Sequence, residues 1–129
     1  MATPTVTRSA SGYAETVAAL VAAIERRGLT VLARVDHAAG ARAVGLELED
    51  EEVVLFGNPR SGTPLMQADR RIGIELPLRI LVWREGDDVF LAHADPRELS
   101  KDYDVEADAS TLEAMANLLE ELARDAGKG

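Results

Sequence analysis

The chain has 129 residues, of which 47% are hydrophobic, and it carries a formal net charge of −9 and no cysteine. This length predicts a single domain, residues 1–129, with enough apolar content for an ordinary core. Because there is no cysteine, a disulfide framework, a thiolate nucleophile and a Cys-ligated metal are excluded. The negative charge argues against nucleic acid as a partner, since phosphate backbones are bound largely by Lys and Arg.

Segments that would direct the chain to a membrane are not evident in the sequence. No apolar run approaches the ~20 residues that span a bilayer. The residues Met1-Ala2-Thr3-Pro4 have neither the basic nor the apolar character of a signal peptide. We therefore expect a cytoplasmic protein without a membrane partner.

The first half of the chain predicts one helix packed on a sheet. Residues Thr5–Ala10 favour an edge strand, and a helix follows from Tyr13 until Gly28 stops it. Its apolar side chains recur at helical spacing: Tyr13, Val17, Leu20, Val21 and Ile24. Three further strands are predicted at Leu29–Val35, Val44–Leu48 and Val53–Phe56. The acidic turn before Val53 is short, so the last two of these strands must run antiparallel.

Glycines and prolines interrupt the pattern after Phe56, and residues 57–64 are expected to form a loop. Thr63 and Pro64 then favour the N-cap and first position of a short helix that ends near Asp69. The remainder predicts an extended segment, two hairpin strands, a short helix and a C-terminal helix, at residues 70–77, 78–83, 89–93, 95–103 and 110–126. Antiparallel strands with helices grouped on one side make a two-layer α+β domain.

Five ordered motifs resemble a bacterial and archaeal family known as domain of unknown function 302. They lie at residues 27–31, 35–41, 55–59, 62–66 and 76–79. The resemblance covers about residues 13–104 and implies a β-α-β(4)-α core with the topology of the TATA-binding protein, and a homodimer. The helix at 110–126 lies beyond that core as an extra element. The resemblance implies neither DNA binding nor a known activity, because a shared fold does not determine function.

Polar side chains follow the buried strand that ends at Phe56, and they suggest an anion site. Asn58, Arg60, Ser61 and Thr63 can hold a carboxylate or phosphate together with the amides that open the following helix. Arg79, inside an otherwise apolar strand, would complete the clamp. The alternative is that Asn58 satisfies its own backbone, Arg60 is solvated and Arg79 lies on the wet face of the sheet.

Asp36 and His37 are the candidate catalytic residues, because a carboxylate beside an imidazole can orient a general base. The alternative is that Asp36 caps a turn while His37 packs against the first helix. A metal site formed with His93 lacks a recognised ligand spacing, and no nucleotide-binding motif appears, so we expect no metal and no cofactor. Trp83 and Tyr103 belong either to a dimer surface or to the core.

These features support three hypotheses of function. The first is a homodimeric binding module for a small anionic molecule, with Asp36, His37, Asn58, Arg60, Thr63 and Arg79 around one pocket. The second is an enzyme of unknown reaction, with His37 as the general base and Asn58 or Arg60 stabilising developing negative charge. The third is a structural domain that uses an apolar sheet edge or face for dimerisation or for binding a partner.

Overall fold

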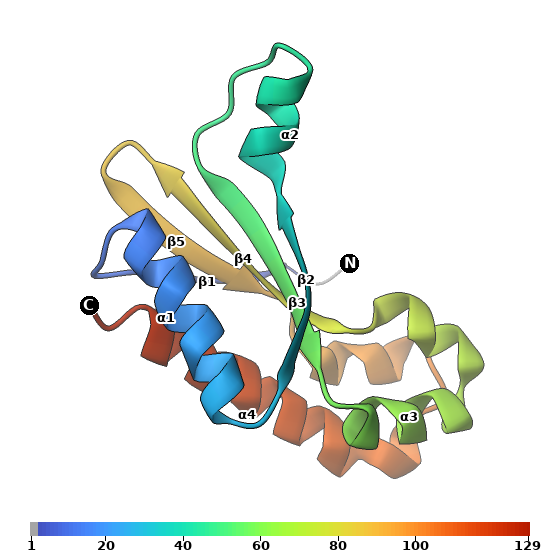
Figure 1. The fold of residues 1–129 in the computed structure, drawn as a ribbon. Helices are drawn as coiled ribbons and strands as arrows, with labels where there is room; N and C mark the ends of the chain where they lie inside the picture. Colours follow the sequence, from blue (N-terminus) through green and yellow to red (C-terminus); the bar gives the residue numbers. More distant parts are fainter. Residues whose placement is uncertain (1–2) are drawn as a thin grey trace.

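The structure is a computed structural model that describes residues 3–129. Met1 and Ala2, part of the segment that lacks signal-peptide features, lie outside these residues. One antiparallel sheet has the strand order β1-β5-β4-β3-β2 (Figure 1). The strands are β1 (Thr5–Arg8), β2 (Thr30–Asp36), β3 (Glu51–Gly57), β4 (Leu78–Glu85) and β5 (Asp88–His93). The two-layer α+β class expected from the sequence is confirmed.

The two long helices, α1 (Tyr13–Arg26) and α4 (Ala109–Ala126), lie side by side on the same face of the sheet (Figure 1). The shorter helices are α2 (His37–Ala43), α3 (Pro59–Ala68) and the 3-10 helices η1 (Arg70–Glu75), η2 (Pro96–Lys101) and η3 (Glu106–Asp108). Four strands, β2 to β5, follow α1, so the chain has the β-α-β(4)-α order that the resemblance implies, with α4 as its final helix. The expectation that the helix at 110–126 is an extra element beyond that core is wrong, because Leu119, Leu122 and Ala126 of α4 are buried in the main core.

The helical stripe predicted for α1 is the part of this helix that packs on the sheet. Val17, Leu20 and Ile24 are buried in the main core, where each apolar side chain contributes roughly 1.5–3 kcal/mol. Gly28 takes a φ of 72° just after the helix, a conformation that favours glycine. The predicted start and end of α1 are therefore both close to the observed ones.

Two buried clusters make up the interior. The main cluster packs α1 and α4 against the side chains of β3, β4 and β5 that face these helices. Its members include Phe56 of β3, Ile80 of β4 and Leu122 of α4. The second cluster holds α3 and η1 against the first half of α4, through Leu65, Ile72, Val105, Leu112 and Met115. Leu78, at the start of β4, is partly buried against both clusters. The site described below lies where these two clusters meet.

The predicted strand at Val44–Leu48 is wrong. Val44 ends α2 and residues 46–49 have no regular structure. The apolar residues of this segment are exposed, with Val44 at 72% and Leu46 at 65% of their full accessibility. Alternation describes only which side chains share a face, and this segment has no neighbouring strand to pair with in the described part of the chain. The extended segment predicted at residues 70–77 is also wrong, since residues 70–75 form η1.

Candidate functional site

The segment after Phe56 begins a helix sooner than the sequence suggested. Asn58 is the N-cap of α3, and its Oδ1 accepts a hydrogen bond from the Arg60 amide at 3.0 Å. Pro59 takes the first helical position, where a missing N–H has no cost. The amides of Ser61 and Gly62 donate to the Asn58 carbonyl at 3.0 and 3.2 Å. Thr63 and Pro64 lie inside the helix, so the start predicted there is wrong.

This early start decides which groups can meet an anion. The amides of the first turn already have acceptors within the chain, so they are not available as a ready-made anion site. Any negative charge held here must be held by side chains. This corrects the expectation that the helix-opening amides take part, and it confirms the alternative in which Asn58 satisfies its own backbone.

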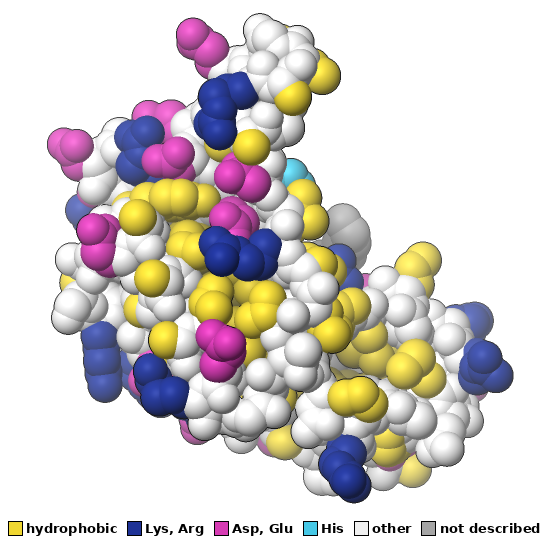
Figure 2. Space-filling view, viewed as in Figure 1, with side chains coloured by type: hydrophobic (Ala, Val, Ile, Leu, Met, Phe, Trp, Pro, Cys, Tyr) yellow, Lys and Arg dark blue, Asp and Glu magenta, His cyan; other side chains and the backbone are white. Residues whose placement is uncertain are grey.

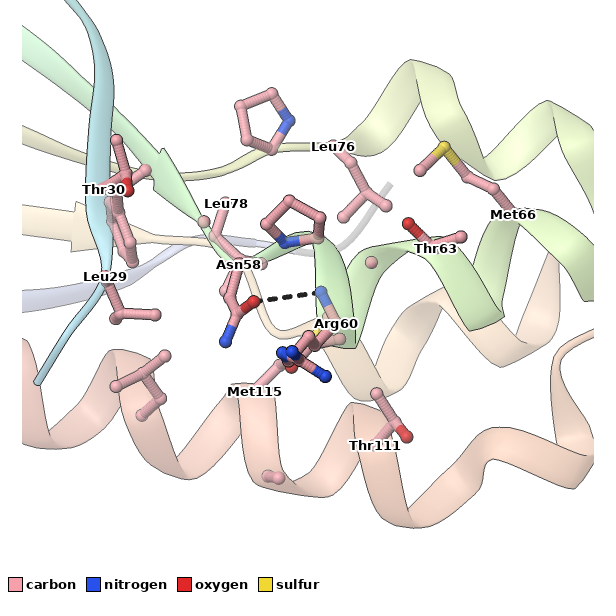
Figure 3. Close-up of a pocket in the computed structure, with 18 of the residues that line it drawn as sticks. Leu29, Thr30, Asn58, Arg60, Thr63, Met66, Leu76, Leu78, Thr111 and Met115 are labelled. Carbon is pink, nitrogen blue, oxygen red and sulfur yellow. Dashed lines mark hydrogen bonds between the residues drawn. The ribbon is translucent and has the colours of Figure 1, made fainter.

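A pocket of about 690 Å³ lies between the ends of β2 and β3, α3, η1 and α4 (Figure 3). In Figure 3, Leu29 and Thr30 lie on one side of Asn58, Leu76 and Met66 lie on the other, and Met115 comes from α4. The lining is mostly apolar. Figure 2 shows hydrophobic side chains gathered where the α3 segment meets the rest of the molecule. The apolar walls are Leu29, Leu32, Phe56, Met66, Leu76, Pro77, Leu78, Ala114, Met115 and Leu118.

Polar side chains line part of this pocket. Asn58, Arg60, Ser61 and Thr63 come from the start of α3, and they are joined by Thr30, Ser110 and Thr111. Arg60 is exposed, and within residues 3–129 no carboxylate lies in ion-pair contact with it. Its guanidinium is therefore an uncompensated positive charge beside apolar walls, in a chain that is strongly negative overall.

A group of polar contacts holds η1 in place, although the residues that make these contacts do not themselves line the pocket. The Asp69 carboxylate accepts from the Arg71 guanidinium at 2.8 Å and from the Asp104 amide at 3.0 Å. These bonds hold the pKa of Asp69 well below its usual range. The Tyr103 hydroxyl donates to Glu75 at 2.8 Å, and this bond raises the pKa of Tyr103. The contacts tie η1 to the segment that leads into α4, so the pocket does not depend on α3 alone.

The structure places Arg79 away from this pocket. Leu78 and Ile80 face the helix layer, and Arg79 between them points to the other face of the sheet, because side chains alternate along a strand. Its guanidinium donates to the Glu75 carbonyl at 3.1 Å. The expectation that Arg79 completes a clamp with Asn58 and Arg60 is therefore wrong. Arg79 lies on the solvent-exposed face of the sheet, as the alternative proposed.

Asp36 and His37 are also not part of the pocket. They lie at the opposite end of β2 from Thr30, which for a seven-residue strand is a separation of roughly 20 Å. Asp36 is the N-cap of α2, with Oδ1 accepting from the Ala39 amide at 2.9 Å. His37 is exposed at the first position of that helix. The capping alternative holds for Asp36, whereas His37 does not pack against α1 as that alternative supposed.

Near Asp36, a set of charges surrounds Tyr13 at the start of α1. Burial, followed by the charges of Glu52 and Asp36, raises the pKa of Tyr13 to about 12. Arg34 lies beside this group and is paired with the nearly buried Glu52. None of these residues lines the pocket at α3.

Two kinds of feature are not found in residues 3–129. There is no group of three or more His, Asp or Glu side chains arranged to hold a metal ion. In the same residues, no helix combines the length and the apolar character needed to cross a membrane.

Most of the apolar residues in the pocket were not identified from the sequence. Leu29 and Leu78 fall in segments that the sequence predicts as strands, and strand alternation does not show that they line a hollow. One pattern could have revealed part of the wall. Thr111, Ala114 and Leu118 follow helical spacing beside the main stripe of α4 (Leu112, Met115, Leu119, Leu122), so this helix has two neighbouring faces to cover.

The chain is similar to several known proteins. The family model for domain of unknown function DUF302 matches residues 5–122, a range that extends on both sides of residues 13–104 and includes most of α4. A crystal structure of an uncharacterized conserved DUF302 protein from Bacillus stearothermophilus superposes with a TM-score of 0.86. The superposition covers 97% of this chain and 98% of that one, at 17% identity. At this identity, the likeness shows the fold alone.

Curated relatives match over a shorter part of their length. Fluoride-specific ion channel FluC 1 of Brucella suis biovar 1 (strain 1330) is 44% identical over 94 residues, which is 72% of this chain and 37% of that protein. Fluoride-specific ion channel FluC 2 of Brucella melitensis biotype 1 has the same identity over 94 residues, and the match covers 35% of it. The chain thus spans little more than a third of the curated relatives it matches.

Proposed function

The chain belongs to the family of domain of unknown function DUF302, and from its pocket we propose that it is a binding module for a small organic anion with an apolar body. The observation that carries this proposal is the combination of a mostly apolar hollow of about 690 Å³ with the unpaired guanidinium of Arg60. Small-molecule sites are typically hollows of about 300–1,000 Å³ with apolar walls and a few polar groups that fix orientation.

The two parts of the pocket have different roles in this proposal. A hydrocarbon body against Leu29, Leu76 and Leu78 gains about 0.8 kcal/mol for each buried methylene group. The acidic head lies toward Arg60, with the hydroxyls of Ser61 and Thr63 as further donors. The walls therefore supply most of the affinity, and Arg60 selects the charge and the direction of the ligand.

The fluoride channels suggest a different anion, which the pocket does not favour. Fluoride is a single strongly hydrated ion, so it would fill little of a 690 Å³ hollow and would gain nothing from apolar walls. The match also covers little more than a third of those channels. We therefore do not extend their activity to this chain, and we keep fluoride as one arm of the test.

The test is calorimetric titration of the intact chain with decanoate, decanol, inorganic phosphate and sodium fluoride. Decanoate should bind most tightly, decanol should bind more weakly, and phosphate and fluoride should produce no saturable heat. Saturation by phosphate or fluoride, with no binding of decanoate, would contradict the proposal. Equal affinity for decanoate and decanol would show that Arg60 does not distinguish a negatively charged ligand from a neutral one.

The alternative of an enzyme with His37 as general base loses its geometric support, because His37 is exposed at the far end of β2 from the pocket. We also propose that the chain is a homodimer, and an open apolar sheet face supports this. The cytoplasmic location and the lack of nucleic-acid and membrane partners stay predictions.

A further inference from the structure

The face of the sheet opposite α1 and α4 has a continuous apolar row across all five strands. The row is established by strand register: Val35 pairs with Val53, Val53 with Leu81, Leu81 with Ala92, and Ala92 with Val6. Because paired residues point to the same side of a sheet, these five side chains form one stripe. Val6 and Val35, at its two ends, keep 54% and 44% of their accessibility.

The rows on either side of this stripe differ in chemistry. On one side, register aligns Glu51, Trp83, Phe90 and Arg8, and the Trp83 and Phe90 rings stack with their centroids 5.4 Å apart. We call this the tryptophan row. On the other side, register aligns Ala33, Leu55 and Arg79, which we call the arginine row.

Two opposite charges on this face have no ion-pair partner. Arg8 is paired with Asp88, and Glu85 accepts from the Trp83 indole at 2.9 Å. In the described part of the chain, Arg79 contacts only a backbone oxygen and Glu51 takes part in no ion pair. A surface hollow of about 440 Å³ beside the tryptophan row is lined by Trp83 and by the carboxylates of Glu49, Glu51 and Glu85. Arg84 also lines it, and its guanidinium is already paired with Glu49 and Asp50. An acidic and aromatic hollow of this kind suits a guanidinium group.

We infer that this face is the dimer interface, and that a second copy packs on it about a two-fold axis lying along the apolar row. Such an axis places each strand over its own counterpart with reversed direction. The apolar row then packs on itself, and the tryptophan row faces the partner's arginine row. Arg79 of each copy comes over Trp83 and into the hollow that Glu51 lines, so opposite charges meet at two symmetric places.

The size of the face agrees with this arrangement. Five strands about 4.8 Å apart, each about six residues long, cover roughly 24 by 20 Å. Two copies packed face to face bury on the order of 1,000 Å² in total, the lower end of the range for specific interfaces. Sheets stacked in this way lie about 10 Å apart with strands near −30°, which leaves room for Leu81 and Val53 to interdigitate. The inference does not depend on the ligand, because the pocket lies on the helix side of the sheet.

The test is a charge exchange followed by sedimentation equilibrium. Arg79→Glu and Glu51→Arg, each alone, should weaken the dimer on the order of 100-fold. Each variant replaces the attraction between opposite charges by repulsion between like charges, and it does so at both symmetric places. The double variant should regain most of the lost affinity, since it restores the opposite charges with the two sides exchanged. Arg124→Glu, an equal charge reversal on the helix layer, should leave the dimer unchanged.

Three results would overturn the inference. They are a wild-type chain that stays monomeric at every concentration, a dimer that both single variants leave intact, and a double variant as weak as the single ones. The second result would assign dimerisation to another surface, such as the free edge of β2. Circular dichroism of each variant shows whether it is folded, and Leu81→Lys in the apolar row gives an independent disruption that should also yield a monomer.

Discussion

A helix begins next to each end of β2, and the two ends differ in the structure that surrounds that helix. At each end a polar residue caps a helix: Asn58 caps α3 beside Thr30, and Asp36 caps α2. The helix that Asn58 caps is held by a buried cluster that includes Leu65 and Ile72, and Asn58 itself lines the large pocket. Behind Asp36, α2 buries only Ala38 and projects away from the rest of the molecule (Figure 1).

This difference shows what makes a site out of polar loop residues. A capping side chain uses an oxygen to accept a backbone N–H, as Asn58 and Asp36 both do, and this capping alone does not make a binding site. The α3 end differs because an apolar hollow and an unpaired arginine lie next to the cap.

Filling the hollow should have the largest effect. Ala114 is exposed on α4 and lines the pocket, so Ala114→Trp places an indole where the ligand body would lie. Excluding about four methylene groups at about 0.8 kcal/mol each weakens decanoate binding about 200-fold. The matched control, Ala43→Trp on α2, should leave calorimetric affinity unchanged. If the two tryptophans weaken binding alike, the pocket has no special role.

Removing the charge should have a smaller effect that depends on the ligand. Arg60→Ala should lower the affinity for decanoate about tenfold, as expected for a partly exposed charge-assisted hydrogen bond. The affinity for decanol should not change, since that ligand has no charge to read. His37→Ala serves as the control from the other end of β2. A loss of decanoate affinity in His37→Ala would mean that the two ends act together.

Removing the N-cap side chains of α3 and α2 should lower the stability of the protein by different amounts. Asn58→Ala should lower the free energy of unfolding in urea by about 1 kcal/mol, a typical cost for a lost N-cap. Asp36→Ala should lower it by less, because α2 can open without disturbing the core. An equal or larger loss in Asp36→Ala would show that α2 is as firmly packed as α3.

The smallest effect appears only at high pH. The pKa of Tyr13 is raised from 10.0 to about 12, so folding favours the protonated hydroxyl. This contribution to stability is fully present below pH 10 and is lost as the pH rises toward 12. Absorbance titration in a Tyr103→Phe background should follow Tyr13 alone, and Asp36→Asn should lower its pKa by removing a nearby negative charge. An unchanged pKa in Asp36→Asn would place Asp36 too far away to act.

The sequence predicts correctly the elements whose periodic apolar side chains are buried against the rest of the protein. The stripe of α1, the strand ending at Phe56 and the C-terminal helix were all predicted near their observed bounds. Val44–Leu48 has an equally regular pattern and forms no strand, because a strand needs a neighbour and periodicity does not show whether one exists. The resemblance gave the right number of strands after α1 where local patterning gave one too many.

The site was predicted only in its polar part. Asn58, Arg60 and Thr63 were identified because they follow a buried strand. Arg79 does not belong with them, because alternation along β4, with Leu78 and Ile80 facing inward, places its side chain on the other face of the sheet. The apolar walls could not be found in advance, because a leucine that lines a hollow has the same local pattern as one that fills a core.

The most direct test of the proposed pocket is a nuclear magnetic resonance titration of the ¹⁵N-labelled chain with decanoate. Amide shifts should concentrate at Leu29, Gly57, Arg60, Gly62, Met66 and Ala114, should saturate, and should be absent from residues 36–43. Shifts confined to residues 36–43, or none at saturating decanoate, would contradict the assignment of this pocket as the binding site.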